Sequence, residues 1–139
     1  MSLATPALEY VLANARTGRR LAVRLQVARA GWRGLFRVLG RRWIDRGEGC
    51  RYLADEPPRR PARLPVDVLF VDRDGVVLYA LAALPSFEAM RSDGIHSVVE
   101  LPAGTIAATG TEPGDRLEML RAVAVALATD PGATVEAPR

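Results

Sequence analysis

The stretch that most constrains the fold runs from Pro65 to Leu81, PVDVLFVDRDGVVLYAL, where two apolar runs flank Asp72-Arg73-Asp74-Gly75. An Asp-Gly pair suits a tight hairpin turn, because glycine adopts positive φ at no steric cost and aspartate tolerates the left-handed region. We therefore predict two antiparallel strands joined by an Asp-Gly turn, and a fold in which β-structure dominates.

Further segments carry strand and turn patterns. Residues 21–27, LAVRLQV, alternate apolar with other side chains, which indicates a half-buried strand. Residues 47–53 are predicted to form a turn that leads into a short strand, residues 97–101 a short strand, and residues 116–119 the beginning of a last strand. Between the last two, Pro102 is expected to open a helical turn and Gly110 to end it in the left-handed conformation. Pro113-Gly114 is the centre of a predicted type II turn.

A short amphipathic helix is predicted within residues 30–43. Its apolar stripe consists of Trp32, Leu35, Phe36, Leu39 and Trp43. A second stripe, spaced by four, consists of Arg29, Arg33, Arg37 and Arg41. This stripe is either a solvated helix face or a secondary basic face that contacts phosphate or an acidic protein.

These elements predict one β-rich α+β domain, a compact antiparallel β-sandwich or small barrel with a short amphipathic helix and one helical turn before the last strand. A chain of 139 residues can bury about two-thirds of its unfolded surface and so form a core without metal or disulfide. Residues 1–17 are expected to be a weakly structured N-terminal segment, residues 18–120 the domain, and residues 121–139 an alanine-rich segment with a flexible tail.

Cysteine content and hydropathy indicate the cellular compartment of the protein. The single cysteine, Cys50, excludes an internal disulfide framework and fits a reducing compartment. The N-terminus has no signal-peptide pattern, and no stretch approaches the roughly 20 apolar residues of a membrane span. We therefore expect a cytoplasmic protein without membrane insertion.

Charge is distributed unevenly along the chain. Residues 1–63 contain 14 arginines and 5 acidic residues, whereas residues 64–139 contain 5 arginines and 11 acidic residues. The two halves are either complementary to each other, which we favour, or the first half contacts an anionic partner.

The segment from Ala54 to Arg63, ADEPPRRPAR, is predicted to be a stiff loop, because proline lacks the N–H donor of a helix or central strand. Arg59, Arg60 and Arg63 therefore lie on an extended backbone and are the best candidate surface for an anion or an acidic partner. A solvated loop is the alternative interpretation.

The order of these signals resembles a known family. The GWRGLFRVLGRR segment, GEG, RLPVDVLFVDRDGVV and HSVVELPAGTIAATGTEPGDRLEM together resemble the bacterial and archaeal family catalogued as domain of unknown function 192, over roughly Leu21 to Met119. The resemblance implies a compact, mainly antiparallel β domain and no catalytic residues, since none are established for the family. Its members usually carry a Cys, His-Thr and Met cluster before the Pro-(Ile/Val)-Asp motif. Here residues 56–62 read Glu-Pro-Pro-Arg-Arg-Pro-Ala, so an activity that depends on that cluster would be lost or changed.

Some residues imitate catalytic or metal sites. Asp72 and Asp74 after an apolar run have the spacing of a phosphatase nucleophile and general acid, but such an enzyme needs further elements that this chain lacks. Cys50 and His96 have no matching partners and are interpreted as packed and as surface or capping residues. Asp67, within an apolar strand, faces solvent or is buried, and we favour a structural pair with an arginine such as Arg63 or Arg24.

These observations favour a non-catalytic accessory protein that binds an acidic protein or a small anionic ligand through Arg59, Arg60, Arg63 and Asp67, without cofactor or metal. Nucleic acid is not expected, because no exposed aromatic side chains for base stacking are evident. The alternative is a small metal-dependent hydrolase that uses Asp72 and Asp74, or Asp67.

Overall fold

The computed structural model describes residues 9–27, 44–55, 65–84 and 93–121. The described elements are β1 (Glu9–Asn14), β2 (Arg20–Val27), β3 (Glu48–Leu53), β4 (Val66–Val71), β5 (Val77–Leu84), β6 (Ser97–Pro102), α2 (Thr105–Thr109) and β7 (Leu117–Arg121). No helix in these ranges is long and apolar enough to cross a membrane. The predicted helix at residues 30–43 lies outside the described residues.

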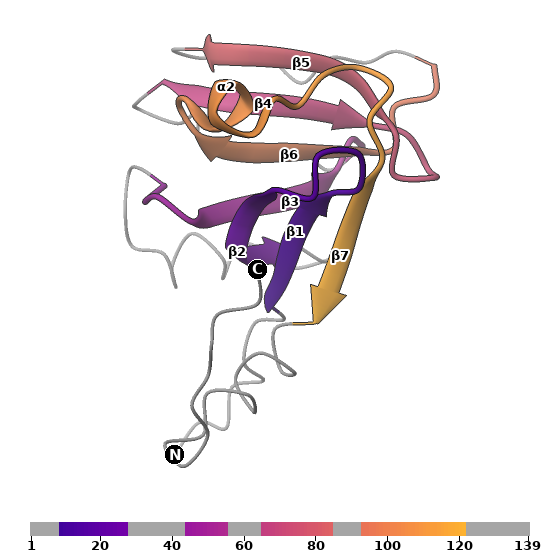
Figure 1. Cartoon of the computed structure of the whole chain (residues 1–139). Helices are drawn as coiled ribbons and strands as arrows, with labels where there is room; N and C mark the ends of the chain where they lie inside the picture. The colour runs from indigo at the N-terminus through magenta and orange to yellow at the C-terminus, as the bar shows by residue number, and fades with distance from the viewer. Residues whose placement is uncertain (1–8, 28–43, 56–64, 85–92, 122–139) are drawn as a thin grey trace, which may run out of the picture.

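The seven strands form one sheet in the order β5-β4-β6-β3-β2-β1-β7. All neighbouring strands are antiparallel except β2 and β3, which are parallel. The sheet curls so that β1 and β7 run steeply across the direction of β4, β5 and β6, and it forms a half-barrel (Figure 1). This confirms the expectation of a mainly β, small-barrel fold.

The edges of the curled sheet meet at one point. Val76 and Arg116 form an isolated antiparallel bridge, and the Leu117 N–H donates to the Gly75 carbonyl at 2.8 Å. A Cβ on Gly75, whose φ is 86°, would lie 3.1 Å from the Leu117 carbonyl oxygen. The turn between β4 and β5 therefore touches the beginning of β7, beyond which the barrel stays open.

The predicted hairpin is confirmed, with a wider turn than the sequence indicates. Strands β4 and β5 pair from Val66 and Leu84 to Val71 and Val77, and residues 72–76 connect them. Gly75 has positive φ, but Asp74 does not. Instead, Oδ1 of Asp72 accepts hydrogen bonds from the backbone N–H groups of Asp74 (2.9 Å) and Val76 (2.8 Å). The aspartate side chain, rather than two left-handed residues, thus shapes the turn.

The two faces of the sheet form two apolar clusters. The inner face of the half-barrel includes Leu12, Leu25, Leu69 and Leu101, and the outer face includes Tyr52, Val68, Phe70 and Val98. Short helix α2 follows the end of β6, and its Ile106 packs against the inner cluster. Helix α2 therefore covers the end of the barrel at which β4 begins and β6 ends.

Strand β2 departs from strict alternation. Val23, expected to face inward, is 45% exposed. Its N–H and that of Arg24 both donate to the Gly47 carbonyl, and the pairing of β1 with β2 shifts register nearby. This irregularity leaves Val23 facing outward, whereas Ala22 before it and Leu25 after it both belong to the inner cluster.

Other boundaries also differ from the prediction. Strand β1 extends the sheet to Glu9, ahead of the expected domain start at residue 18. Pro102 is the last residue of β6 rather than the opening of the helix, which begins at Thr105. Strand β7 continues to Arg121, beyond the predicted strand residues 116–119. Gly110 ends α2 with φ of 66°, as predicted.

The predicted type II turn at Pro113-Gly114 is present. Gly114 has φ of 96°, and the Asp115 N–H donates to the Glu112 carbonyl at 3.1 Å. This turn leads directly into the point at which the barrel edges meet.

Candidate functional site

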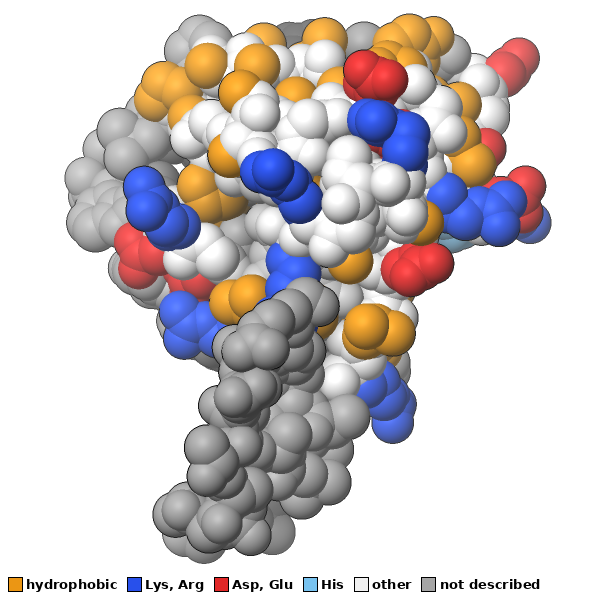
Figure 2. All heavy atoms as spheres, viewed as in Figure 1, with side chains coloured by type: hydrophobic (Ala, Val, Ile, Leu, Met, Phe, Trp, Pro, Cys, Tyr) orange, Lys and Arg blue, Asp and Glu red, His pale blue; other side chains and the backbone are white. Residues whose placement is uncertain are grey.

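The predicted arginine surfaces lie outside the described residues. These are Arg59, Arg60 and Arg63 of the proline-rich loop and Arg29, Arg33, Arg37 and Arg41 of the secondary basic face. On the molecular face in Figure 2, the described arginines and acidic side chains are interspersed, and no single-sign patch dominates. A binding role for the arginines of the loop and of the basic face therefore stays a prediction.

Asp67 is a buried structural carboxylate, as expected, but the partners found among the described residues are backbone N–H groups rather than arginines. The residue is 0% exposed. Oδ1 accepts a hydrogen bond from the Ala83 N–H at 2.8 Å. Oδ2 accepts from the N–H groups of Gly104 (3.1 Å) and Ile106 (2.8 Å) at the start of α2. Asp67 thus caps the helix from the neighbouring strand β4. The expected pair with Arg24 is wrong, because Arg24 instead pairs with Glu48. Arg63, the other arginine expected as a partner, lies outside the described residues.

The other acidic candidates do not gather into a metal site. Asp72 uses Oδ1 within the hairpin turn, and both carboxylate oxygens of Asp67 accept hydrogen bonds from backbone donors. Within the described ranges, no group of three or more His, Cys, Asp or Glu side chains could hold a metal ion. These contacts support structural roles for Asp67 and Asp72.

Cys50 is packed within the outer face of the sheet, as predicted. It lies directly across from Glu100 of β6, and Tyr52 follows on the same face of β3. Burial, together with the Glu100 charge, raises the pKa values of the Cys50 thiol and the Tyr52 hydroxyl. Burial also raises the pKa of Glu100. A thiol with a raised pKa is a poor nucleophile, so this cluster has the properties of a core rather than of a reactive site.

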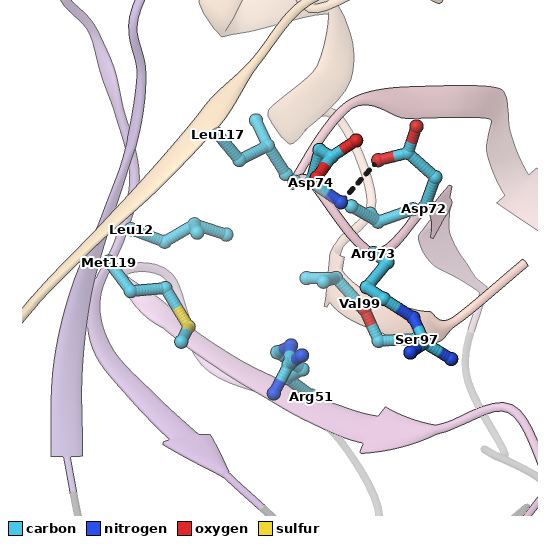
Figure 3. Close-up of a pocket in the computed structure, with 11 residues that line it drawn as sticks. Leu12, Arg51, Asp72, Arg73, Asp74, Ser97, Val99, Leu117 and Met119 are labelled. Atoms are coloured by element: carbon cyan, nitrogen blue, oxygen red, sulfur yellow. Dashed lines mark hydrogen bonds between the residues drawn. The ribbon is translucent and has the colours of Figure 1, made fainter.

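A pocket of about 340 Å³ lies on the inner face, at the end of the barrel opposite α2 (Figure 3). Its lining comes from β1, β3, the end of β4, the hairpin turn, the start of β6 and β7. The lining residues are Leu12, Arg51, Val71, Asp72, Arg73, Asp74, Gly75, Ser97, Val99, Leu117 and Met119. The pocket therefore combines an apolar wall with a few polar groups, as small-molecule sites commonly do.

Arg51 is the central polar residue of this pocket. It lies on the inner face of β3, directly across from Val99 of β6 and beside Val27 of β2. Its side chain extends from β3 into the space between Met119 and Ser97 (Figure 3). In the described part of the chain, its guanidinium has no hydrogen bond or ion pair, and burial lowers its pKa, an effect that Tyr10 opposes. Because arginine stays protonated in proteins, a positive charge is held here, and none of the described acidic side chains forms an ion pair with it.

Ser97 supplies a second unpaired group. The residue is 1% exposed, and its Oγ has no hydrogen-bond partner among the described residues. Ser97 begins β6 and shares the inner face with Val99, so both line the pocket. A buried hydroxyl without a partner carries a desolvation penalty that a ligand can relieve.

Sequence reasoning did not single out Arg51 or Ser97. A signal was present in β3, Glu48-Gly49-Cys50-Arg51-Tyr52-Leu53, where Arg51 alternates with Gly49 and Leu53 on one face. A charged residue on an apolar face of a central strand is a candidate for function. The parallel pairing of β2 with β3, which places Arg51 inside the barrel, could not be deduced from this pattern.

Comparisons with known proteins support the fold. The family model described as DUF192, uncharacterized ACR, matches residues 13–119 and confirms the resemblance drawn from the sequence. No curated protein matches the chain. The crystal structure of a proposed transcription regulator from Sinorhizobium meliloti 1021 is similar, with a TM-score of 0.58 and 28% identity over 86% of this chain and 98% of that one. A protein of unknown function from Novosphingobium aromaticivorans DSM 12444 has a TM-score of 0.58 and 21% identity over 85% and 90% of the two chains, which indicates a shared fold alone.

Proposed function

The chain belongs to the DUF192 family, and on that premise we propose that it is a non-catalytic binding protein whose half-barrel pocket takes a small anionic ligand. The observation that carries this proposal is the Arg51 guanidinium, which lines the pocket without an ion pair to any described residue. A small anion in the pocket would supply the missing counter-charge.

Energetics favour a ligand-binding role for Arg51 over a purely structural one. Burying a charged group without a partner is costly, and a structural core position is better served by an apolar residue of similar volume. Val99 and Val27, the direct neighbours of Arg51 across the strands, are apolar. An arginine at this position thus costs stability, and anion binding would offset that cost.

The pocket also fits a small molecule better than a protein segment. Its volume of about 340 Å³ lies at the lower end of typical ligand pockets, and the walls belong to strands of the half-barrel. Metal-dependent hydrolysis, the alternative drawn from the sequence, has no supporting contact among the described residues. The carboxylates of Asp67 and Asp72 are engaged by backbone donors.

An NMR titration of the full chain tests the proposal. Amide resonances would be followed while acetate, sulfate, inorganic phosphate or a poly-glutamate peptide is added. We expect at least one small anion to shift the resonances of Gly75, Ser97 and Val99, which line the pocket. The peptide, being too large for the pocket, is expected to leave these resonances unchanged.

Two matched variants complete the experiment. Arg51→Gln removes the charge in the pocket and is expected to weaken binding by about tenfold or more, the usual scale for a charge-assisted contact. Arg46→Gln removes an exposed arginine outside the pocket and should bind as wild type does. Equal losses in both variants, or no shift of the pocket resonances with any small anion, would contradict the proposal.

Duplex DNA is a further ligand to add in the titration, because the Sinorhizobium meliloti relative is described as a proposed transcription regulator.

A further inference from the structure

The lining of the half-barrel pocket narrows the chemistry of its ligand. Resting on the proposed function, we infer that the ligand is a small monocarboxylate with an apolar body. Its carboxylate pairs with the guanidinium of Arg51, and its body lies against Leu12, Leu117 and Met119. Three features of the pocket carry this inference: the fork of Arg51, the charges at the rim and the apolar wall facing Arg51.

The guanidinium of Arg51 is suited to a planar anion. Its N–H groups form a rigid fork that matches the two oxygens of a carboxylate. The apolar neighbours Val27 and Val99 flank the residue on the inner face, so water screens the pair less than at the surface. A bidentate pair would thus satisfy the charge and fix the orientation of the ligand.

The charges at the rim favour a single negative charge on the ligand. The charged residues that line the pocket are Arg51, Arg73, Asp72 and Asp74, so their formal charges cancel. Arg73 is exposed on the turn, between the two aspartates. A dianion such as a phosphate monoester would carry a second negative charge toward Asp72 and Asp74 with Arg51 as its main cation. Repulsion by the two aspartates should weaken the binding of a polyanion more than the binding of a monocarboxylate.

The wall opposite Arg51 is apolar and accessible. Leu12 of β1 lies directly across from Met119 of β7, and Leu117 follows on the same face of β7. Leu12 and Met119 lie on one side of Arg51, and Ser97 lies on the other (Figure 3). Met119 is 39% exposed, so a ligand that covers it removes apolar surface from water. A volume of about 340 Å³ suits a ligand of on the order of ten non-hydrogen atoms.

Ser97 adds a directional contact beside Arg51. Its hydroxyl can both donate and accept a hydrogen bond, and it has no partner in the described part of the chain. Rotation about its Cα–Cβ bond would present the hydroxyl to a ligand oxygen. A carboxylate, with lone pairs left over after it binds Arg51, could accept this bond.

Calorimetric titration with a graded set of probes tests the inference. The probes are acetate, butanoate, hexanoate, hexanol, hexyl phosphate and inorganic phosphate, added to wild-type protein and to Arg51→Gln. Affinity should rise from acetate to hexanoate by up to about fourfold per added methylene, the scale of burying one methylene. Hexanoate should bind at least about tenfold more tightly than hexanol or hexyl phosphate, and Arg51→Gln should remove that preference for hexanoate over hexanol.

Two readouts keep the test independent of the folding of one variant. In wild-type protein, hexanoate should shift the methyl resonance of Met119, which lies on the apolar wall. Met119→Gln should weaken hexanoate binding more than acetate binding, because it changes the apolar wall and leaves Arg51 in place. If both affinities fall equally, the apolar body does not lie on this wall, and the inference is wrong.

The outcomes separate the inference from the function on which it rests. Binding of inorganic phosphate or hexyl phosphate as tight as that of hexanoate, lost in Arg51→Gln, would overturn the monocarboxylate and leave the anion site standing. Absence of binding by every anion would overturn both. Hexanoate binding that Arg51→Gln does not weaken would place the carboxylate elsewhere and overturn the inference.

Discussion

Asp67 and Arg51 are both charged residues on the inner face of the same sheet, and their surroundings differ. Asp67 of β4 accepts three hydrogen bonds from backbone N–H groups and has no exposed surface. Arg51 of β3 lies at a hollow and has no ion pair among the described residues. A buried charge whose hydrogen-bonding capacity is filled stabilises the fold. One whose capacity is unfilled beside a pocket is instead a candidate for binding.

The largest effect that separates the two sites is expected for Asp67→Ala. The variant leaves the N–H groups of Ala83, Gly104 and Ile106 without their acceptor, which should reduce the free energy of unfolding by about 3 kcal/mol or more. Urea denaturation measures this loss. Asp93→Ala, at an exposed aspartate, is the matched control and should stay within about 0.5 kcal/mol of wild type. Equal free energies of unfolding for the two variants would contradict a structural role for Asp67.

A second prediction concerns how tightly the inner face is packed next to Arg51. A Cβ at Gly49 would lie 2.9 Å from Cδ2 of Leu101 and 3.0 Å from Cδ1 of Leu25. Gly49→Ala should therefore lower the free energy of unfolding by about 1–3 kcal/mol, a cost typical of overpacking. Ser97→Ala is the comparison at the pocket end of this face. It removes an unpartnered hydroxyl and should be neutral or stabilising, and a larger loss there than at Gly49 would contradict the contrast.

The third prediction concerns Asp115, a carboxylate that accepts hydrogen bonds as Asp67 does, but mainly from side chains. The hydrogen bond from Arg16, with further ones from Asn14 and the Glu112 N–H, holds the pKa of Asp115 well below its usual range. Its contribution is thus present above the unfolded-state pKa of about 3.9 and is lost as the pH falls through the lower, folded-state value. The stability of wild type should fall more steeply than that of Asp115→Asn between about pH 5 and pH 3. Parallel curves in thermal unfolding would show that Asp115 is not responsible.

The smallest effect on stability is expected for Arg51→Met. Replacing a half-buried charge that has no ion pair among the described residues by an apolar side chain of similar length should leave the free energy of unfolding within about 1 kcal/mol of wild type, or raise it. Chemical denaturation without ligand measures this. A loss as large as that of Asp67→Ala would mean that Arg51 has a structural partner and would weaken the binding proposal.

The hairpin and the satisfied turns were predictable because their signals are local. Asp72 and Gly75 define the turn between β4 and β5 within a few residues of chain. The partners of Asp67 were not predictable, since Ala83, Gly104 and Ile106 come from distant segments and act through backbone N–H groups that any residue type except proline provides. The sequence therefore indicated that Asp67 is an exceptional carboxylate within an apolar strand, but it did not indicate which groups donate hydrogen bonds to it.

The pocket was hidden from sequence for a related reason. Arg51 and Met119 line the same hollow only because β3 pairs with β2 in parallel and β7 pairs with β1. The bulge at Val23 shows how one inserted residue changes which side chains face inward. Face assignments therefore depend on register, which the alternation of a single strand does not determine.

The pairing of β1 with β7 also has a consequence for how the chain reaches its native state. Asn14 donates to Asp115 at 2.9 Å across a separation of 101 residues, so the first described strand acquires this neighbour only after all the intervening residues have been synthesised. Contacts of such long range slow folding, because a large loop must close before they form. Until β7 arrives, one edge of β1 remains unpaired and open to association with other chains. Newly made protein should therefore be most vulnerable to aggregation just before β7 leaves the ribosome.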